Sequence, residues 1–79
     1  MSYESDEARK RKADMLYEKL DYNNDRESFQ EVLDEVVSLI GPMSDPTETR
    51  AYRKIRYLSR ESDYDWKKAA CDDALISLG

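Results

Sequence analysis

The stretch RESFQEVLDEVVSLI, residues 26–40, decides the fold class of this chain. Its apolar residues recur every three or four positions and form one stripe: Phe29, Val32, Leu33, Val36, Val37, Leu39 and Ile40. Its polar residues lie on the opposite face: Glu31, Asp34, Glu35 and Ser38. This spacing predicts an amphipathic α-helix with one buried side. Gly41 and Pro42 predict its end, because proline cannot continue a helix and glycine tolerates a left-handed cap.

Three further helices are expected around this one, at about residues 6–20, 46–59 and 63–78. The first has four apolar residues at helical spacing: Ala13, Leu16, Tyr17 and Leu20. The third has a strong start signal, since Asp45 suits the cap and Pro46 suits the first helical position. The fourth is expected to begin after Ser62, which forms a capping box with Asp65.

The fourth helix differs from the others because it is apolar on more than one side. Trp66, Ala70, Ala74 and Leu78 fall on one line along it, whereas Ala69, Leu75 and Ile76 lie off that line. Either the other helices surround it, or it offers the contact surface of a homodimer. The connectors are short, which favours antiparallel neighbours. We therefore expect one all-α domain over residues 1–79, a small antiparallel four-helix bundle, with a three-helix bundle and a docked fourth helix as the alternative.

The composition excludes several kinds of chemistry. The chain has 79 residues, a net charge of −5, one cysteine and no histidine. Ser-His-Asp and Cys-His catalysis are therefore impossible, and so are an internal disulfide and an all-cysteine zinc site. We expect no enzyme activity and no cofactor. No apolar stretch resembles a signal peptide or could cross a membrane, so we expect a cytoplasmic protein that does not bind membranes.

The segment just before the second helix resembles the calcium-binding loop of an EF-hand. Asp21, Asn23 and Asp25 stand at its first, third and fifth positions, where such a loop has oxygen ligands. The match fails at the sixth position, where Arg26 replaces the turn glycine, and at the twelfth, where Val32 replaces the bidentate glutamate. We expect a polar connector in which Asn24 or Asp25 caps the second helix. Weak binding of a divalent ion at these oxygens is the alternative.

Two charged faces are candidates for partner binding. The third helix carries a basic face with one aromatic residue: Arg50, Arg53, Lys54, Arg56, Tyr57 and Arg60. The second helix and its connector carry an acidic face: Asp25, Glu27, Glu31, Asp34 and Glu35. Guanidinium groups beside an aromatic ring bind phosphates and stack on bases, and they equally bind acidic protein surfaces. The two faces can also pair with each other inside the molecule or remain solvated.

These observations favour a small acidic, non-enzymatic protein-binding module that acts as an inhibitor, adaptor or regulator of a larger protein. The acidic face of the second helix is the expected contact for a basic target. By analogy, chains of this kind inhibit nucleic-acid enzymes, some of them as phage-encoded proteins. Two alternatives stay open. The first is nucleic-acid binding through the third helix, and the second is self-association through Ala69, Leu75 or Ile76 of the fourth helix.

Overall fold

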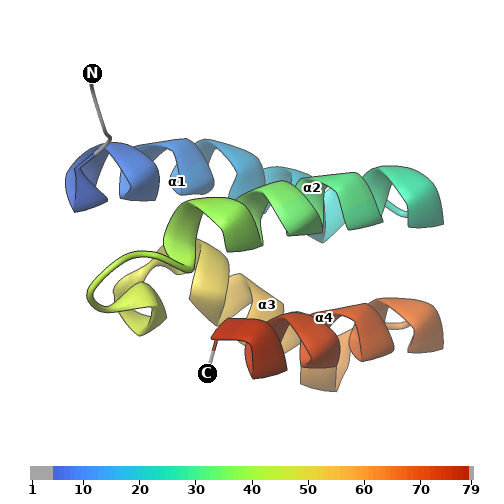
Figure 1. Ribbon diagram of the computed structural model, residues 1–79. Helices are drawn as coiled ribbons and strands as arrows, with labels where there is room; N and C mark the ends of the chain where they lie inside the picture. The colour runs from blue at the N-terminus through green and yellow to red at the C-terminus, as the bar shows by residue number, and fades with distance from the viewer. Residues whose placement is uncertain (1–4, 79) are drawn as a thin grey trace.

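The computed structural model describes residues 5–78 as four α-helices and one short 3-10 helix (Figure 1). These elements are α1 (Asp6–Tyr22), α2 (Arg26–Ile40), η1 (Pro46–Glu48), α3 (Arg50–Glu61) and α4 (Asp65–Leu78). No strand occurs among the described residues. The prediction of a small all-α four-helix bundle is therefore confirmed.

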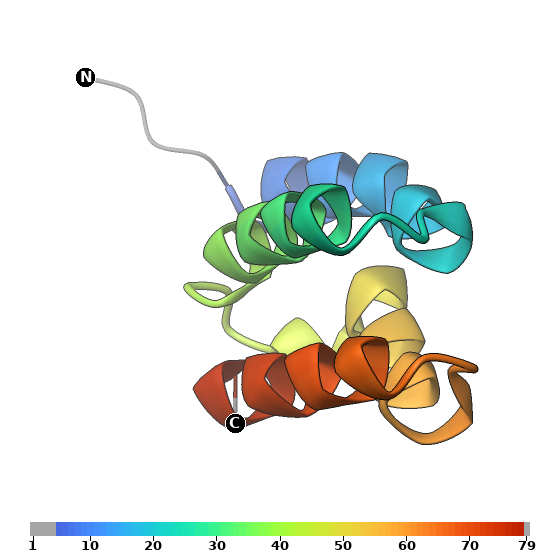
Figure 2. The same ribbon diagram turned by 90° about the vertical axis from the view of Figure 1, so that its right-hand side faces the viewer.

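The four helices form two helical hairpins that pack on each other (Figure 1; Figure 2). α1 packs against α2, and α3 packs against α4; across the hairpins, α1 contacts α3 and α2 contacts α4. Successive helices run in alternating directions (Figure 1). α2 and α3 therefore lie diagonally opposite each other. This placement keeps their outer faces on different sides of the bundle.

The core contains apolar side chains from all four helices. Its buried members are Ala13, Leu20, Phe29, Leu33, Val36, Ile40, Ala51, Ile55, Leu58, Cys71 and Ala74. Phe29 of α2 and Trp66 of α4 join the two hairpins, with ring centroids 5.5 Å apart in an edge-to-face arrangement. Each fully buried leucine, isoleucine or phenylalanine contributes about 2 kcal/mol by leaving water. These contributions offset the conformational entropy that so short a chain loses on folding.

The start of the third helix differs from the sequence prediction. Residues 46–48 form the separate turn η1, and α3 begins four residues later than predicted. Thr49 is the cap: its hydroxyl oxygen accepts from the Tyr52 backbone N–H at 3.0 Å, and its hydroxyl donates to the Pro46 carbonyl at 2.8 Å. Asp45 makes no cap bond, and its carboxylate accepts a hydrogen bond from the Thr47 hydroxyl instead. The buried Thr49 satisfies two backbone bonds at once, which explains why it caps α3 in place of Asp45.

The fourth helix begins at Asp65, two residues later than predicted, and it buries a different line of residues. Ser62 does not form the predicted box with Asp65; its oxygen accepts from the Tyr64 N–H at 3.2 Å in the preceding turn. The buried line is Lys67, Cys71 and Ala74, with Trp66, Ala70 and Leu78 half-buried beside it. The predicted line counted only apolar side chains, and it therefore missed a buried lysine.

The ends of α1, α2 and α3 also differ in part from the sequence prediction. α1 and α3 each extend two residues beyond their predicted ends. α2 ends where predicted, but Gly41 has right-handed backbone (φ −55°), so the expected left-handed cap is wrong. A Cβ at Gly41 would lie 2.8 Å from the Val37 carbonyl oxygen, and this close approach is what requires glycine. The Arg9 guanidinium of α1 donates to the Ser38 and Leu39 carbonyls at 3.4 and 3.2 Å, which places a cation at the negative end of α2.

Candidate binding surfaces

The outer side of α3 carries the predicted cations and tyrosine, and we call this surface the α3 basic face. It comprises Arg50, Arg53, Lys54, Arg56, Tyr57 and Arg60. The four arginines are exposed, Lys54 is half-buried and the Tyr57 side chain is 55% exposed. Three core residues anchor the opposite side of the helix: Ala51, Ile55 and Leu58. All six predicted residues are thus held on the solvent side of α3.

Lys54 is the one cation of the α3 basic face with a charged partner among residues 5–78. Its ammonium lies 3.3 Å from the Asp21 carboxylate of α1 and 5.4 Å from the ring centre of Tyr57. The guanidinium groups of the four arginines form no ion pair or hydrogen bond within this range. The acidic face of α2 cannot reach them, because α2 and α3 are diagonal in the bundle. The internal pairing considered as an alternative therefore does not occur in this structure.

Tyr57 lines two shallow hollows of the α3 basic face, and we call them the Tyr57 hollows. One has a volume of about 380 Å³ and is lined by Arg53, Arg56, Tyr57, Arg60 and Glu61. The other has a volume of about 290 Å³ and is lined by Tyr17, Arg50, Arg53, Lys54 and Tyr57. Their walls are mostly apolar atoms, consistent with the aliphatic stems of these cations and the tyrosine rings. Such a surface offers contact area beside the charges.

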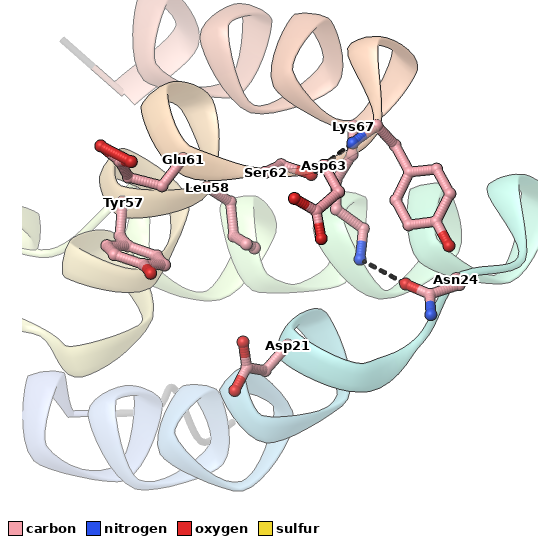
Figure 3. A pocket seen from close by; sticks show the side chains of 9 residues that line it. Asp21, Asn24, Tyr57, Leu58, Glu61, Ser62, Asp63 and Lys67 are labelled. Carbon is pink, nitrogen blue, oxygen red and sulfur yellow. Dashed lines mark hydrogen bonds between the residues drawn. The ribbon is translucent and has the colours of Figure 1, made fainter.

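A third hollow opens where the α1–α2 connector meets the turn before α4, and we call it the Lys67 pocket (Figure 3). Its volume is about 190 Å³. It is lined by Asp21, Asn24, Tyr57, Leu58, Glu61, Ser62, Asp63, Tyr64 and Lys67. Figure 3 shows the Lys67 amine directed at Asn24, whereas the Asp21 carboxylate on α1 points away from both. The pocket is polar, and its lining includes three carboxylates and one ammonium.

Lys67 is the residue of this region that sequence reasoning missed. Its side chain is 2% exposed, and its ammonium donates to the Leu20 carbonyl at 3.4 Å and to the Asn24 side-chain oxygen at 3.1 Å. It also lies 4.8 Å from the ring centre of Phe29. Burial lowers the pKa of Lys67 below its ordinary 10.5, because the charged form loses water. The signal in the sequence was its spacing four residues before Cys71, which puts both on one side of α4.

Cys71 lies one turn beyond Lys67 and is also fully buried. Burial raises the pKa of the Cys71 thiol to about 12. The thiol therefore stays protonated at neutral pH, whereas the nucleophile in cysteine chemistry is the thiolate. The Lys67 ammonium, one turn away, is held by two oxygen acceptors and lies beside the rings of Phe29 and Tyr64.

The oxygens of the degenerate calcium loop are engaged in other contacts. The Asp25 carboxylate caps α2 by accepting from the Ser28 backbone N–H at 2.9 Å, and this bond lowers the pKa of Asp25. The Asn23 side chain accepts from the Asp25 N–H at 3.2 Å, and Asp21 pairs with Lys54. In the part of the chain that the structure describes, no three acidic or cysteine side chains converge to hold a metal ion. Of the two caps considered for α2, the structure selects Asp25.

The acidic face of α2 lies diagonally across the bundle from the α3 basic face. Its exposed members are Asp25, Glu27, Glu31, Asp34 and Glu35. None of the large exposed hydrophobic side chains of residues 5–78 lies on α2. The carboxylates form no salt bridge within those residues, although Asp34 accepts a hydrogen bond from the Gln30 amide at 2.9 Å. This surface has charge but no aromatic anchor.

The family-model, curated-protein and solved-structure comparisons found no match. The geometry of the chain therefore carries the functional argument by itself. Across residues 5–78, no helix has the length and apolar character needed to span a membrane.

The remaining candidate contact lies on α4. Ile76 is 78% exposed, Ala69 is exposed and Leu75 is half-buried against the core. The first two are separated by almost two helical turns and are flanked by the exposed carboxylates of Asp72 and Asp73. Acidic residues beside an isolated isoleucine make a poor apolar interface. Among the surfaces considered, the α3 basic face combines exposed charges, the exposed ring of Tyr57 and the two Tyr57 hollows.

Proposed function

We propose that this chain is a non-enzymatic protein-binding module whose contact surface is the α3 basic face and whose partner presents an acidic surface. One observation carries the proposal: four exposed arginines with no partner among residues 5–78 accompany an exposed tyrosine that lines two hollows. Tyrosine and arginine are the side chains that most often dominate binding energy at protein interfaces. Such a module inhibits, links or regulates a larger protein by covering part of its surface.

The choice of face differs from the sequence expectation, which placed the contact on the acidic face of α2. That face has carboxylates alone, and carboxylates are depleted at the centre of protein interfaces. The α3 basic face has apolar walls beside its charges, so a partner can bury area there as well as form ion pairs. A surface that offers both supplies affinity and orientation together.

The experiment is affinity capture from a lysate of the source cells with a matched pair of variants. Arg53→Glu with Arg56→Glu reverses two charges on the α3 basic face. Lys10→Glu with Arg11→Glu reverses two exposed charges on α1 and is the control. We expect one protein to be retained by the wild type and the control, lost by the α3 variant and resistant to nuclease. A captured set that is the same for both variants would overturn the proposal.

Nucleic acid is the second candidate for the same face, because an exposed ring among guanidinium groups can stack on a base. The net charge of −5 opposes this reading, because the dense charge of a phosphate backbone repels the chain more strongly than an acidic patch on a protein does. Fluorescence polarisation with labelled single-stranded DNA, RNA and duplex DNA at low salt decides it. Binding that falls steeply with salt and is lost in the α3 variant would favour nucleic acid. Undetectable binding at about 20 mM salt removes it.

A further inference from the structure

Two stripes of opposite charge run along the outer sides of α2 and α3. We define the acidic stripe as Glu27, Glu31 and Asp34, and the arginine stripe as Arg53, Arg56 and Arg60. All six side chains are exposed. None of them forms a salt bridge within residues 5–78, and Asp34 keeps only its hydrogen bond from Gln30.

The spacing of the two stripes matches when the helices run antiparallel. From Glu27 the acidic stripe advances by four residues to Glu31 and by three more to Asp34. From Arg60 the arginine stripe goes back by four residues to Arg56 and by three more to Arg53. At 1.5 Å per residue, both stripes have charges at about 0, 6 and 10.5 Å along the axis. The three positions of each stripe also lie on one face of their helix.

This match pairs three carboxylates with three guanidinium groups when one helix lies along the other. The expected pairs are Glu27 with Arg60, Glu31 with Arg56, and Asp34 with Arg53. The same register brings Gln30 beside Tyr57, since each lies three residues along from the first pair. A tyrosine hydroxyl and a carboxamide can form a hydrogen bond there. The contact therefore places the ring of Tyr57 near its centre.

The two stripes of one chain cannot meet each other. α2 and α3 lie diagonally opposite in the bundle, and their outer faces point to different sides (Figure 2). A second copy is therefore needed to bring an acidic stripe onto an arginine stripe. Such a contact joins different surfaces of the two copies and leaves one free stripe on each.

We propose that copies of this chain associate head to tail, with the acidic stripe of one copy lying antiparallel on the arginine stripe of the next. The occupant is a second copy, so the inference goes beyond the proposed function and needs no other protein. It also implies competition, because self-association covers the surface that binds the acidic partner. Exposed ion pairs are individually weak and are screened by salt, so the association is weak and requires low salt and high concentration.

Sedimentation velocity tests the proposal directly on the full chain. At about 20 mM NaCl and up to about 1 mM protein, we expect the average mass to rise above 9.3 kDa with concentration. At about 500 mM NaCl, where charges are screened within a few ångströms, it should return to the monomer value. A wild type that remains at 9.3 kDa in low salt overturns the proposal.

Charge exchange then tests the register. Reversing one stripe, either Glu27→Lys, Glu31→Lys and Asp34→Lys or Arg53→Glu, Arg56→Glu and Arg60→Glu, should abolish association. Combining both sets restores the complementarity and leaves the net charge at −5, so association should return. Glu18→Lys, Glu48→Lys and Asp72→Lys change net charge as the acidic-stripe variant does but spare both stripes, and should still associate. Association that persists in both single-stripe variants overturns the proposal and points to another surface.

Two further measurements distinguish unfolding from loss of association, and failure of the self-association proposal from failure of the proposed function. Circular dichroism verifies that each variant is folded; where a reversal unfolds the chain, the glutamine versions at the same three positions replace it and should also remain monomeric. The acidic-stripe variant keeps the α3 basic face intact. If it is monomeric yet still captures the acidic partner, both proposals stand. If the wild type associates but captures no partner, the proposed function alone fails.

Discussion

The arginines of α3 and Lys67 of α4 lie on helices that pack against each other, yet they differ in burial and in internal partners. The arginines of the α3 basic face are exposed and have no internal partner among residues 5–78. Lys67 is buried, and its ammonium is held by the Leu20 carbonyl, the Asn24 side chain and the Phe29 ring. A buried charge is retained only when it is paired, whereas an exposed one needs no partner. The comparison therefore shows Lys67 as part of the packed interior and the α3 arginines as exposed to a partner.

Lys67→Ala should have the largest effect on stability. It removes a long buried side chain and leaves the Leu20 carbonyl and the Asn24 oxygen without their donor. We expect a loss of about 3 kcal/mol in the free energy of unfolding, measured by urea denaturation at neutral pH. Lys67→Met keeps most of the volume and should lose roughly half as much. An alanine variant as stable as the wild type would show that the contacts of Lys67 do not stabilise the fold.

Asn24→Ala should have the next largest effect. It deletes one acceptor of the buried ammonium, and hydrogen bonds to charged groups contribute about 1.5 kcal/mol or more. Asn23→Ala is the matched control, because its side chain accepts only from an exposed backbone N–H. The control should lose clearly less stability in the same urea titration. Equal losses would show that the connector itself, rather than the Lys67 contact, is being measured.

Cys71 predicts a pH dependence of stability. Its pKa is about 12 in the folded state against an ordinary 9.0, so the unfolded chain loses the thiol proton first. The stabilisation is therefore complete below pH 9.0 and declines as pH rises toward 12, by up to about 1.4 kcal/mol per pH unit. Cys71→Ala should lack this decline. The difference in urea stability between the two proteins at pH 8 and pH 10 measures it, and a constant difference would contradict the burial of the thiol.

Arg53→Ala and Arg56→Ala should have the smallest effect on folding. Both side chains are exposed and unpaired within the described residues, so each change should alter the free energy of unfolding by less than about 0.5 kcal/mol. The same variants should weaken capture of the acidic partner. A large loss of stability would show that these arginines, like Lys67, support the fold.

Much of the architecture could be predicted from local patterns. The stripe from Phe29 to Ile40 predicted α2 with its observed bounds, because three- and four-residue spacing alone brings side chains onto one helix face. The start of α3 could not be predicted, since Asp45–Pro46 and Thr49 offer competing caps and packing decides between them. The α3 basic face was visible in the spacing of its residues. The absence of internal partners for its four arginines within residues 5–78 was not.

The sequence by itself determined that the chain is helical, where most of its helices lie and which residue types line each face, because these properties depend on neighbours within a few positions. Only the tertiary structure decided which helices touch. It placed the Lys67 ammonium beside the end of α1, where the Leu20 carbonyl accepts its hydrogen bond and the ring of Phe29 lies close to the charge. It also set α2 and α3 on the diagonal, which leaves their opposite charges apart. Both outcomes depend on contacts between residues far apart in the chain, and helical spacing carries no information about them.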